Sequence, residues 1–119
     1  NKVMKILVID DEDLVRRALK RALIHMSHEV KDASGGEEGI LIWESWKPDI
    51  VLLDVLMPSM SGPEVLQKVE KGETKVVLMS AYKGKYDSES AKGLGADDFL
   101  AKPFDNVFDV VKVLETSYG

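Results

Sequence analysis

The chain has 119 residues, a length at which one domain buries a single core, and we expect residues 1–119 to form one domain. Its 16 basic and 21 acidic residues give a net charge of -5, so it lacks the positive charge with which proteins bind nucleic acids or anionic membranes directly. The absence of cysteine excludes disulfides, zinc–thiolate sites and thiol nucleophiles, and no apolar run approaches the roughly 20 residues of a membrane span. We therefore expect a cytoplasmic protein.

The first two elements are predicted from a change of period in the apolar residues. Lys5 to Ile9 is an apolar run rich in branched side chains, which is typical of a strand buried on both faces. Helical spacing follows, with Asp13 as the expected N-cap. The apolar residues at this spacing are Leu14, Val15, Ala18, Leu19, Ala22, Leu23 and Met26. The basic residues of the same segment are interpreted as a solvated helix face: Arg16, Arg17, Lys20 and Arg21.

The second predicted strand is more polar than the first, and a second helix follows it. His28 to Ala33 is a more polar strand, expected at a sheet edge, and a helix is expected from Glu37 to about Trp46. The large apolar residues of this helix should face inward: Ile40, Trp43 and Trp46. The two histidines, His25 and His28, have no further metal ligands near them in the sequence and are interpreted as surface residues.

The central strand carries a single carboxylate. Ile50 to Pro58 is a short apolar run that places Asp54 at the carboxyl end of a strand buried on both faces. Pro63 suits the first position of the short helix that follows, which Gly72 is expected to end.

The remaining elements complete an alternating pattern. Strands are expected at Lys75 to Met79 and at Asp98 to Ala101, the latter stopped by Pro103, which lacks an N–H group. The segment from Gly84 to Gly95 has few apolar residues, so its helix should be the least stable one. A last helix is expected from about Asn106 to Thr116, capped by Asp105.

Five successive strand–helix units predict an α/β fold with a parallel sheet. Right-handed crossovers place the carboxyl ends of all strands on one edge, where open sheets bind their ligands. Side chains from four strand ends should therefore meet there: Asp10 and Asp11, Asp54, Ser80 and Lys102.

This combination of side chains points to phosphoryl chemistry. Clustered carboxylates repel one another unless they are protonated or bound to a cation, and Mg²⁺ prefers one or two carboxylates together with waters and phosphate oxygens. Mg²⁺, or Mn²⁺ in its place, and Lys102 would neutralise the phosphoryl oxygens. A carboxylate nucleophile at Asp54 would give an energy-rich, hydrolysable acyl phosphate, which suits a timed signal.

Four motifs in register resemble the receiver domain of bacterial two-component response regulators. They are Val8-Ile-Asp-Asp-Glu12, Leu53-Asp-Val-Leu-Met-Pro58 with Gly62, Met79-Ser-Ala81, and Ala96-Asp-Asp-Phe-Leu-Ala-Lys-Pro-Phe104. The resemblance implies a flavodoxin-like (βα)5 doubly wound sheet with strand order 2-1-3-4-5. It also implies a signalling domain rather than a conventional enzyme, with self-catalysed phosphotransfer and autodephosphorylation as its only chemistry.

The resemblance also implies a role for individual residues. Asp54 matches the phosphoacceptor, and its donor would be the phosphohistidine of a sensor histidine kinase or of a phosphotransfer protein. Asp11 matches the acidic metal ligand, with Asp10 beside it acting indirectly and the backbone carbonyl of Leu56 completing the protein ligands. The other matches are Ser80 as the switch hydroxyl, Lys102 as the phosphoryl-pairing lysine, Phe99 as the switch aromatic, and Pro103 as the residue after a cis peptide bond.

Several positions depart from the usual family pattern. Serine replaces the common threonine at Ser80, and phenylalanine replaces the frequent tyrosine at Phe99. Leu56 and Tyr82 occupy positions that tune the access of water, and their bulk predicts slow autodephosphorylation.

In the family reading, phosphorylation reshapes the face formed by the fourth helix, fifth strand and fifth helix, which would bind an output domain, an output protein or a second copy. Asp97 and Lys112 could contribute to a symmetric dimer there.

Three other functions are weighed against this one. An aspartyl-phosphate phosphatase of the haloacid-dehalogenase type would need a second aspartate where Leu56 stands. A flavodoxin would not place four consecutive acidic residues, Asp10 to Asp13, after its first strand, because they would repel the flavin phosphate. A receiver-like protein-binding module that is not regulated by phosphorylation stays open.

Overall fold

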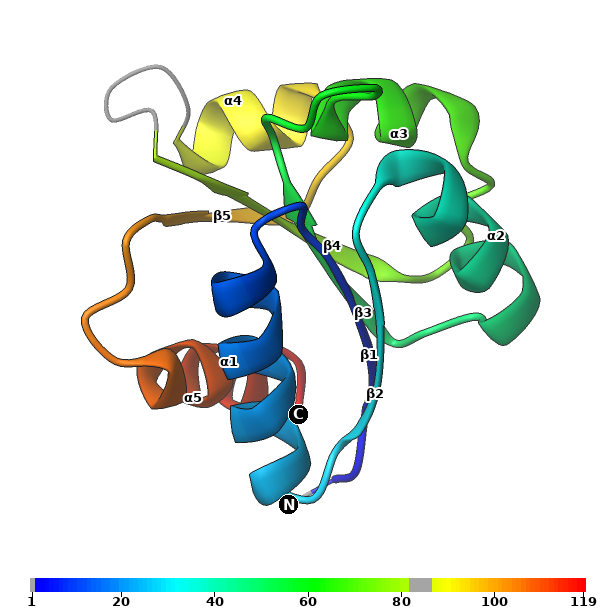
Figure 1. Cartoon of the computed structure of the whole chain (residues 1–119). Helices are drawn as coiled ribbons and strands as arrows, with labels where there is room; N and C mark the ends of the chain where they lie inside the picture. Colours follow the sequence, from blue (N-terminus) through cyan, green and yellow to red (C-terminus); the bar gives the residue numbers. More distant parts are fainter. Residues whose placement is uncertain (1, 82–86) are drawn as a thin grey trace.

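The computed structural model describes residues 2–81 and 87–119, in which five strands alternate with five helices (Figure 1). The strands are β1 (Lys5–Ile9), β2 (Glu29–Ala33), β3 (Ile50–Asp54), β4 (Lys75–Ser80) and β5 (Asp98–Ala101). The helices are α1 (Asp13–His25), α2 (Gly36–Trp46), α3 (Gly62–Lys68), α4 (Ser88–Gly93) and α5 (Val107–Tyr118). Most of the predicted boundaries agree within two residues.

The five strands form one parallel sheet in the order β2-β1-β3-β4-β5, which confirms the predicted flavodoxin-like topology. The three inner strands, β1, β3 and β4, are almost wholly buried, as their unbroken apolar runs predict. The polar strand β2 lies at one edge, also as predicted, and β5 lies at the other.

Alternate residues of each inner strand enter two separate cores. In β1, Leu7 and Ile9 pack with residues of α2 and α3, whereas Ile6 and Val8 pack with residues of α1 and α5. Figure 1 shows the corresponding layers, with α1 and α5 on one side of the sheet and α2, α3 and α4 on the other. Trp43 is fully buried in the first core, and Ile40 and Trp46 lie at its margin, so the predicted inward face of α2 is confirmed.

The predicted helix ends are wrong at several positions. Glu12, not Asp13, is the N-cap of α1, and Asn106, not Asp105, caps α5 by accepting a hydrogen bond from the N–H of Phe108 at 2.9 Å. The short helix α3 ends at Lys68, whereas Gly72 lies in the following turn with a φ of 62°. Helix α4 is shorter than expected, beginning after its N-cap Asp87, and Tyr82 and Tyr86 lie outside the described residues.

Two polar residues that were predicted to be solvated are buried. Arg16 turns from α1 toward the sheet edge and is only 9% exposed. His28 is 6% exposed, because its Nδ1 accepts the N–H of Met4 at 3.1 Å and its Nε2 lies 2.8 Å from Glu115. Both residues satisfy their polar atoms inside the fold, which makes their burial tolerable. Within the described residues, no helix is long and apolar enough to cross a bilayer.

Candidate functional site

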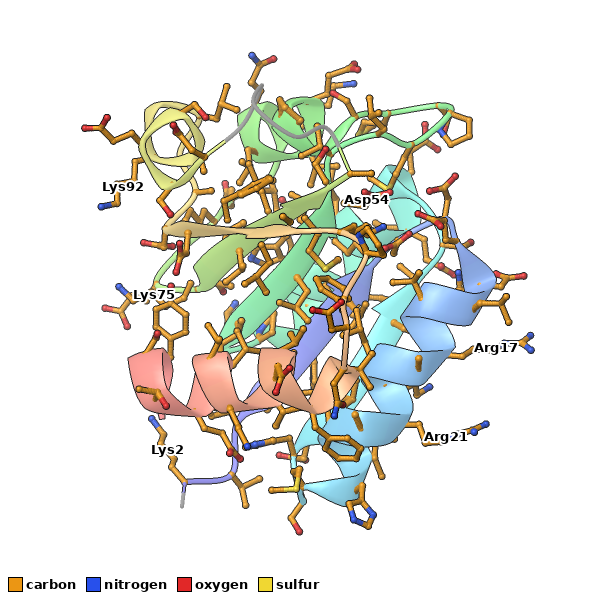
Figure 2. All side chains as sticks on the ribbon, turned by 90° about the vertical axis from the view of Figure 1, so that its left-hand side faces the viewer. Lys2, Arg17, Arg21, Asp54, Lys75 and Lys92 are labelled. Carbon is orange, nitrogen blue, oxygen red and sulfur yellow. The ribbon has the colours of Figure 1, made fainter. Side chains whose placement is uncertain are left out.

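The carboxyl edge of the sheet brings together the ends of four strands. Asp54 and Ser80 are the last residues of β3 and β4, Asp10 follows β1, and Lys102 follows β5. All four residues are buried, with exposed fractions of 5% or less. Figure 2 labels Asp54 at the end of its strand. The predicted convergence of acidic, hydroxyl and cationic groups is therefore present in the fold.

The ammonium group of Lys102 lies between the carboxylates of Asp10 and Asp54 and a third carboxylate, that of Glu12. Its Nζ lies 2.6 Å from Asp10 Oδ2, 2.9 Å from Glu12 Oε1 and 3.4 Å from Asp54 Oδ1. The backbone N–H of Lys102 donates to the carbonyl of Ser80 at 2.9 Å, and the peptide bond to Pro103 is cis, as the family resemblance implies. Lys102 is thus held from two sides of the site.

The electrostatics of the site are dominated by buried like charges. Burial and the neighbouring carboxylate of Asp10 raise the pKa of Asp54 to about 7, against the opposing effect of Lys102, and a hydrogen bond with Asp11 adds to the rise. Burial alone would lower the pKa of Lys102, but its bonds to Asp10 and Glu12 outweigh that effect and raise it. An ammonium flanked by three carboxylates leaves excess negative charge, which a cation could neutralise.

Glu12 is a site residue that the sequence analysis missed. One carboxylate oxygen from each of Asp10, Glu12 and Asp54 lies within 4.8 Å of the other two, so these three residues could hold a metal ion. The sequence did contain a signal, since Glu12 continues the acidic run after the first strand. Only the folded loop shows that the Glu12 side chain turns toward Lys102 although the residue itself is exposed.

The remaining predicted metal ligands are more exposed. Asp11 is exposed and lies outside the cluster of Asp10, Glu12 and Asp54, although its side chain contributes to the raised pKa of Asp54. Leu56 follows β3 with 56% of its surface exposed, and its role in water access and metal binding stays a prediction, as does that of Tyr82 outside the described residues.

The two predicted switch residues lie on adjacent strands. Ser80 is paired in register with Ala101, and Phe99 is paired with Leu78. Ser80 is 2% exposed, and Phe99 is half-buried against the core on the α2 and α3 side. Ser80 is thus the last residue of β4, next to the site, and Phe99 lies in the neighbouring strand β5.

Gly62 explains how the loop after β3 fits over Asp54. A Cβ atom at this position would come within 2.6 Å of the Asp54 carbonyl oxygen, and the Gly62 N–H donates to the carbonyl of Val55 at 2.8 Å. Only glycine allows this approach. A capping box between Ser61 and Glu64 then starts α3, so the loop that carries Leu56 is fixed at both ends.

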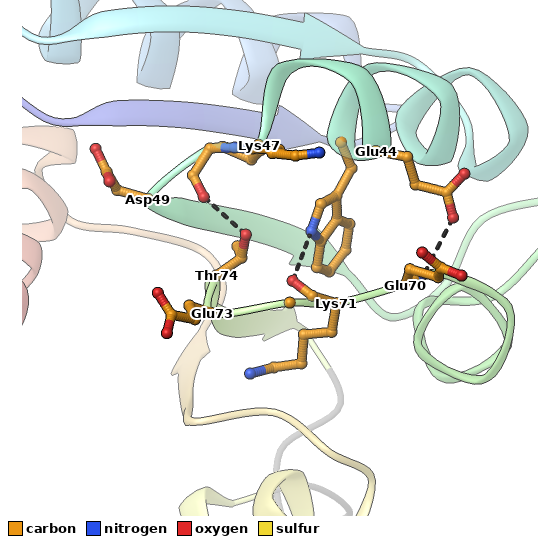
Figure 3. A pocket seen from close by; sticks show the side chains of 10 residues that line it. Glu44, Lys47, Asp49, Glu70, Lys71, Glu73 and Thr74 are labelled. Atoms are coloured by element: carbon orange, nitrogen blue, oxygen red, sulfur yellow. Dashed lines mark hydrogen bonds between the residues drawn. The ribbon is translucent and has the colours of Figure 1, made fainter.

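Two cavities differ in their relation to this site. A cavity of about 540 Å³ lies at the amino end of the sheet, between the end of α2 and the loop before β4, far from Asp54 in the fold (Figure 3). Its polar groups bond to one another: Thr74 Oγ1 to the Pro48 carbonyl at 2.7 Å, and Trp43 Nε1 to the Lys71 carbonyl at 3.3 Å. A more open groove of about 330 Å³ adjoins the site itself, and Glu12 and Lys102 are among the residues that line it.

The fold and the acidic cluster together define a flavodoxin-like domain whose carboxyl edge carries three carboxylates that could hold a metal ion. The chain belongs to the family of response regulator receiver domains: residues 6–113 match the family model described as "Response regulator receiver domain". It is therefore a receiver domain of the kind used in two-component signal transduction, and receiver domains are signalling modules.

Relatives and solved structures agree with this assignment. The chain is 38% identical over 105 residues to "Probable transcriptional regulator ycf27" of Pyropia yezoensis, covering 87% of this chain and 43% of that protein. It is 37% identical over 105 residues to "Regulatory protein AtoC" of Escherichia coli, covering 87% of this chain and 23% of that protein. The chain thus spans less than half the length of these curated relatives.

The structure is also similar to that of the chemotaxis protein CheY4 of Vibrio cholerae. The TM-score is 0.86 at 26% identity, covering 97% of this chain and 98% of that one. NtrX from Brucella abortus gives a TM-score of 0.87 at 27% identity, covering 98% of this chain but 27% of NtrX.

Proposed function

We propose that this receiver domain accepts a phosphoryl group on Asp54 from a phosphohistidine, with Mg²⁺ or Mn²⁺ as cofactor, and that the transfer takes place in the cytoplasm. The observation that carries the proposal is the contact of Lys102 Nζ with the carboxylates of Asp10, Glu12 and Asp54 at 2.6–3.4 Å. This arrangement places the ammonium group of Lys102 and the carboxylates of Asp10 and Glu12 around the buried nucleophile Asp54.

The transfer requires little of the protein beyond positioning and charge. A carboxylate oxygen of Asp54 attacks the phosphorus, the P–N bond to the donor histidine breaks, and its electron pair leaves with the imidazole, which takes a proton from solvent. Lys102 lies 3.4 Å from Asp54 Oδ1 and can pair with the incoming phosphoryl oxygens. Hydrolysis of the acyl phosphate later returns Asp54 and inorganic phosphate.

The donor set fits a hard divalent cation. The carboxylates of Asp10, Glu12 and Asp54 offer oxygen ligands within 4.8 Å of one another, and the side chain of Asp11 acts on the pKa of Asp54. Asp11, Asp54 and the Leu56 carbonyl would hold the ion, with Asp10 acting indirectly, and Glu12 joins this set. When bound, the ion would neutralise negative charge on the phosphoryl oxygens.

The signal would leave the site through Ser80 and Phe99. In this proposal, Ser80 moves toward the phosphoryl group and Phe99 fills the space that opens. The face formed by α4, β5 and α5 already exposes Leu94 and Val113 by 37% each, which suits an output domain or a second copy. Lys112 remains a candidate contact, whereas Asp97 is engaged within the chain by the N–H of Val76 at 2.8 Å.

The groove beside the site is proposed to receive a helix of the phosphohistidine protein. Its lining is mostly apolar, from Leu14, Val15, Ala18, Phe104 and Val107, and Leu14 is 84% exposed. Because Glu12 and Lys102 line the same groove, a helix seated there would bring its histidine to Asp54.

The test uses a small acyl phosphate as donor. Wild-type protein with Mg²⁺ should gain one hydroxylamine-labile phosphoryl group by intact mass, and Asp54→Asn should gain none. Asp105→Asn, a change at an exposed carboxylate on the loop after Lys102, serves as the matched control and should behave as wild type. No adduct on wild type would favour a binding module that is not regulated by phosphorylation, and turnover of many phosphate esters would favour a phosphatase.

A further inference from the structure

Arg16 sits on the buried side of α1 and bonds to three different acceptors. Its Nη1 donates to the backbone carbonyl of Asp10 at 2.9 Å, its Nε donates to Asp32 Oδ2 at 2.8 Å, and its Nη2 donates to Asp13 at 2.7 Å. The side chain is 11% exposed, so these bonds form largely away from water. The bond to Asp13 contributes least, because that carboxylate is 66% exposed.

The bond to the Asp10 carbonyl completes a full set of restraints on Asp10. Its N–H donates to Ala33, Oδ1 accepts the N–H of Glu12 at 2.9 Å, and Oδ2 accepts Lys102 at 2.6 Å. Every polar atom of this fully buried residue is therefore engaged. The bond from Arg16 fixes the plane of the peptide between Asp10 and Asp11, and that plane sets the direction in which the Asp11 side chain leaves the loop.

Asp32 anchors Arg16 to the sheet. It lies in the edge strand β2, and its two carboxylate oxygens accept Arg16 Nε and Lys20 Nζ, both at 2.8 Å. Burial would raise the pKa of Asp32, but its bonds to Lys20 and Arg16 outweigh that effect and lower it. The carboxylate therefore stays ionised and holds the guanidinium in a fixed orientation.

We propose that Arg16 and Asp32 form a positioning pair that holds the loop from Asp10 to Glu12 in its cation-accepting arrangement. The inference rests on the proposed function of the site and adds two residues that touch neither the phosphoryl group nor the metal. It also accounts for the burial of a charged residue on a helix that has solvent available on its other face.

The guanidinium shape is required for this role. Arg16 uses three nitrogens in one plane to reach a backbone carbonyl and two carboxylates from separate segments. A lysine at this position would keep the charge but offer a single nitrogen, so it could not hold Asp10 and Asp32 together. The neighbouring Arg17 points away from the fold in Figure 2, which makes it the matched control.

The test measures cation binding without any phosphodonor. Mn²⁺ is titrated into the protein, and the free ion is followed by electron paramagnetic resonance. We expect Arg16→Lys and Asp32→Asn to bind Mn²⁺ roughly tenfold more weakly than wild type, at the low end of the loss seen when support for a metal ligand is removed. Arg17→Lys should bind as wild type does. Circular dichroism and thermal melting establish the folded fraction of each variant.

The outcomes separate this inference from the proposed function. If the wild type binds Mn²⁺ and is phosphorylated but folded Arg16→Lys and Asp32→Asn bind the ion equally well, the positioning role is wrong and the pair is merely structural. If the wild type binds no Mn²⁺, the proposed cation-dependent function fails with it. Should Arg16→Lys not fold, Asp32→Asn decides alone, because it keeps the arginine and neutralises the carboxylate that anchors it.

Discussion

The amino and carboxyl ends of the strands, here called the amino and carboxyl edges of the sheet, differ in how their polar side chains are paired. At the amino edge, such groups pair with a definite partner: His28 with the Met4 N–H and with Glu115, and Thr74 with the Pro48 carbonyl. At the carboxyl edge, the buried Asp10 and Asp54 and the exposed Glu12 share the ammonium group of Lys102. The amino edge is therefore arranged for stability, whereas the carboxyl edge keeps an excess of negative charge that a ligand can neutralise.

The largest effect should come from removing the shared cation. Lys102→Met should slow phosphorylation by a small acyl phosphate by about 10²-fold, the loss typical for one charge-stabilising group. Mn²⁺ should bind at least as tightly, because a competing positive charge is gone from the carboxylates. Lys75→Met, at the exposed start of β4, is the control and should leave both quantities unchanged. Equal rates for Lys102→Met and wild type would show that the lysine does not act on the transfer.

The excess negative charge around Asp54 should lower the free energy of unfolding, and this effect can be measured without a phosphodonor. Asp54 holds its proton in the folded state up to a pKa of about 7, compared with an ordinary value of 3.8. Its contribution to stability is thus complete below about pH 4 and is lost as the pH rises through 7. At pH 8 and without divalent cations, Asp54→Asn should raise the free energy of unfolding by roughly 1–3 kcal/mol, since one pKa unit corresponds to about 1.4 kcal/mol.

Urea unfolding at pH 5 and pH 8 measures this difference, with Asp105→Asn as the matched control. The gain should be larger at pH 8 than at pH 5 and should shrink when Mg²⁺ is added. An identical gain in the free energy of unfolding at both pH values would mean that the charge on Asp54 does not destabilise the folded state.

The amino edge should show the reverse pattern. His28→Ala leaves the Met4 N–H and the Glu115 carboxylate without their partner, which should cost about 1–3 kcal/mol of unfolding free energy. Mn²⁺ affinity and the phosphorylation rate of the folded fraction should not change. His25→Ala, on the more exposed neighbouring histidine, is the comparison for stability. A loss of phosphorylation in folded His28→Ala would break the division between the two edges.

The smallest effect concerns the groove next to the site. Leu14→Arg places a charge on an 84% exposed apolar residue and should slow transfer from a phosphohistidine protein roughly tenfold, the loss expected from about 1.4 kcal/mol of docking energy. Transfer from a small acyl phosphate should be unaffected. Leu41→Arg, on an exposed apolar residue of α2, should leave both reactions unchanged. Equal slowing with both donors would place the effect in the site rather than in docking.

The fold could be predicted from sequence because the period of its apolar residues is a local property. The runs Lys5–Ile9 and Ile50–Asp54 are unbroken, and such strands have to be buried on both faces. Once the strands are known, the rule for right-handed crossovers is enough to bring Asp10, Asp54, Ser80 and Lys102 to one edge. The helix caps were less predictable, because Asp13 and Glu12 are adjacent acidic residues and the backbone angles decide between them.

The errors concern residues whose surroundings come from distant segments. Arg16 was assigned to a solvated face because its neighbours in the helix are basic, but its burial depends on Asp32, 16 residues away. His28 was assigned to the surface, and its partner Glu115 is 87 residues away. Glu12 was passed over because the reach of its side chain to Lys102 depends on the path of a loop. Periodicity carries no information about such partners.

Beryllofluoride, a phosphoryl mimic, gives the most direct test of the charge cluster at the carboxyl edge. We expect ¹⁹F resonances of a bound adduct to appear with the wild type only when Mg²⁺ is present, and we expect none with Asp54→Asn. A bound adduct that forms without a divalent cation, or that persists in Asp54→Asn, would contradict the claim that this edge is a cation-dependent phosphoacceptor site.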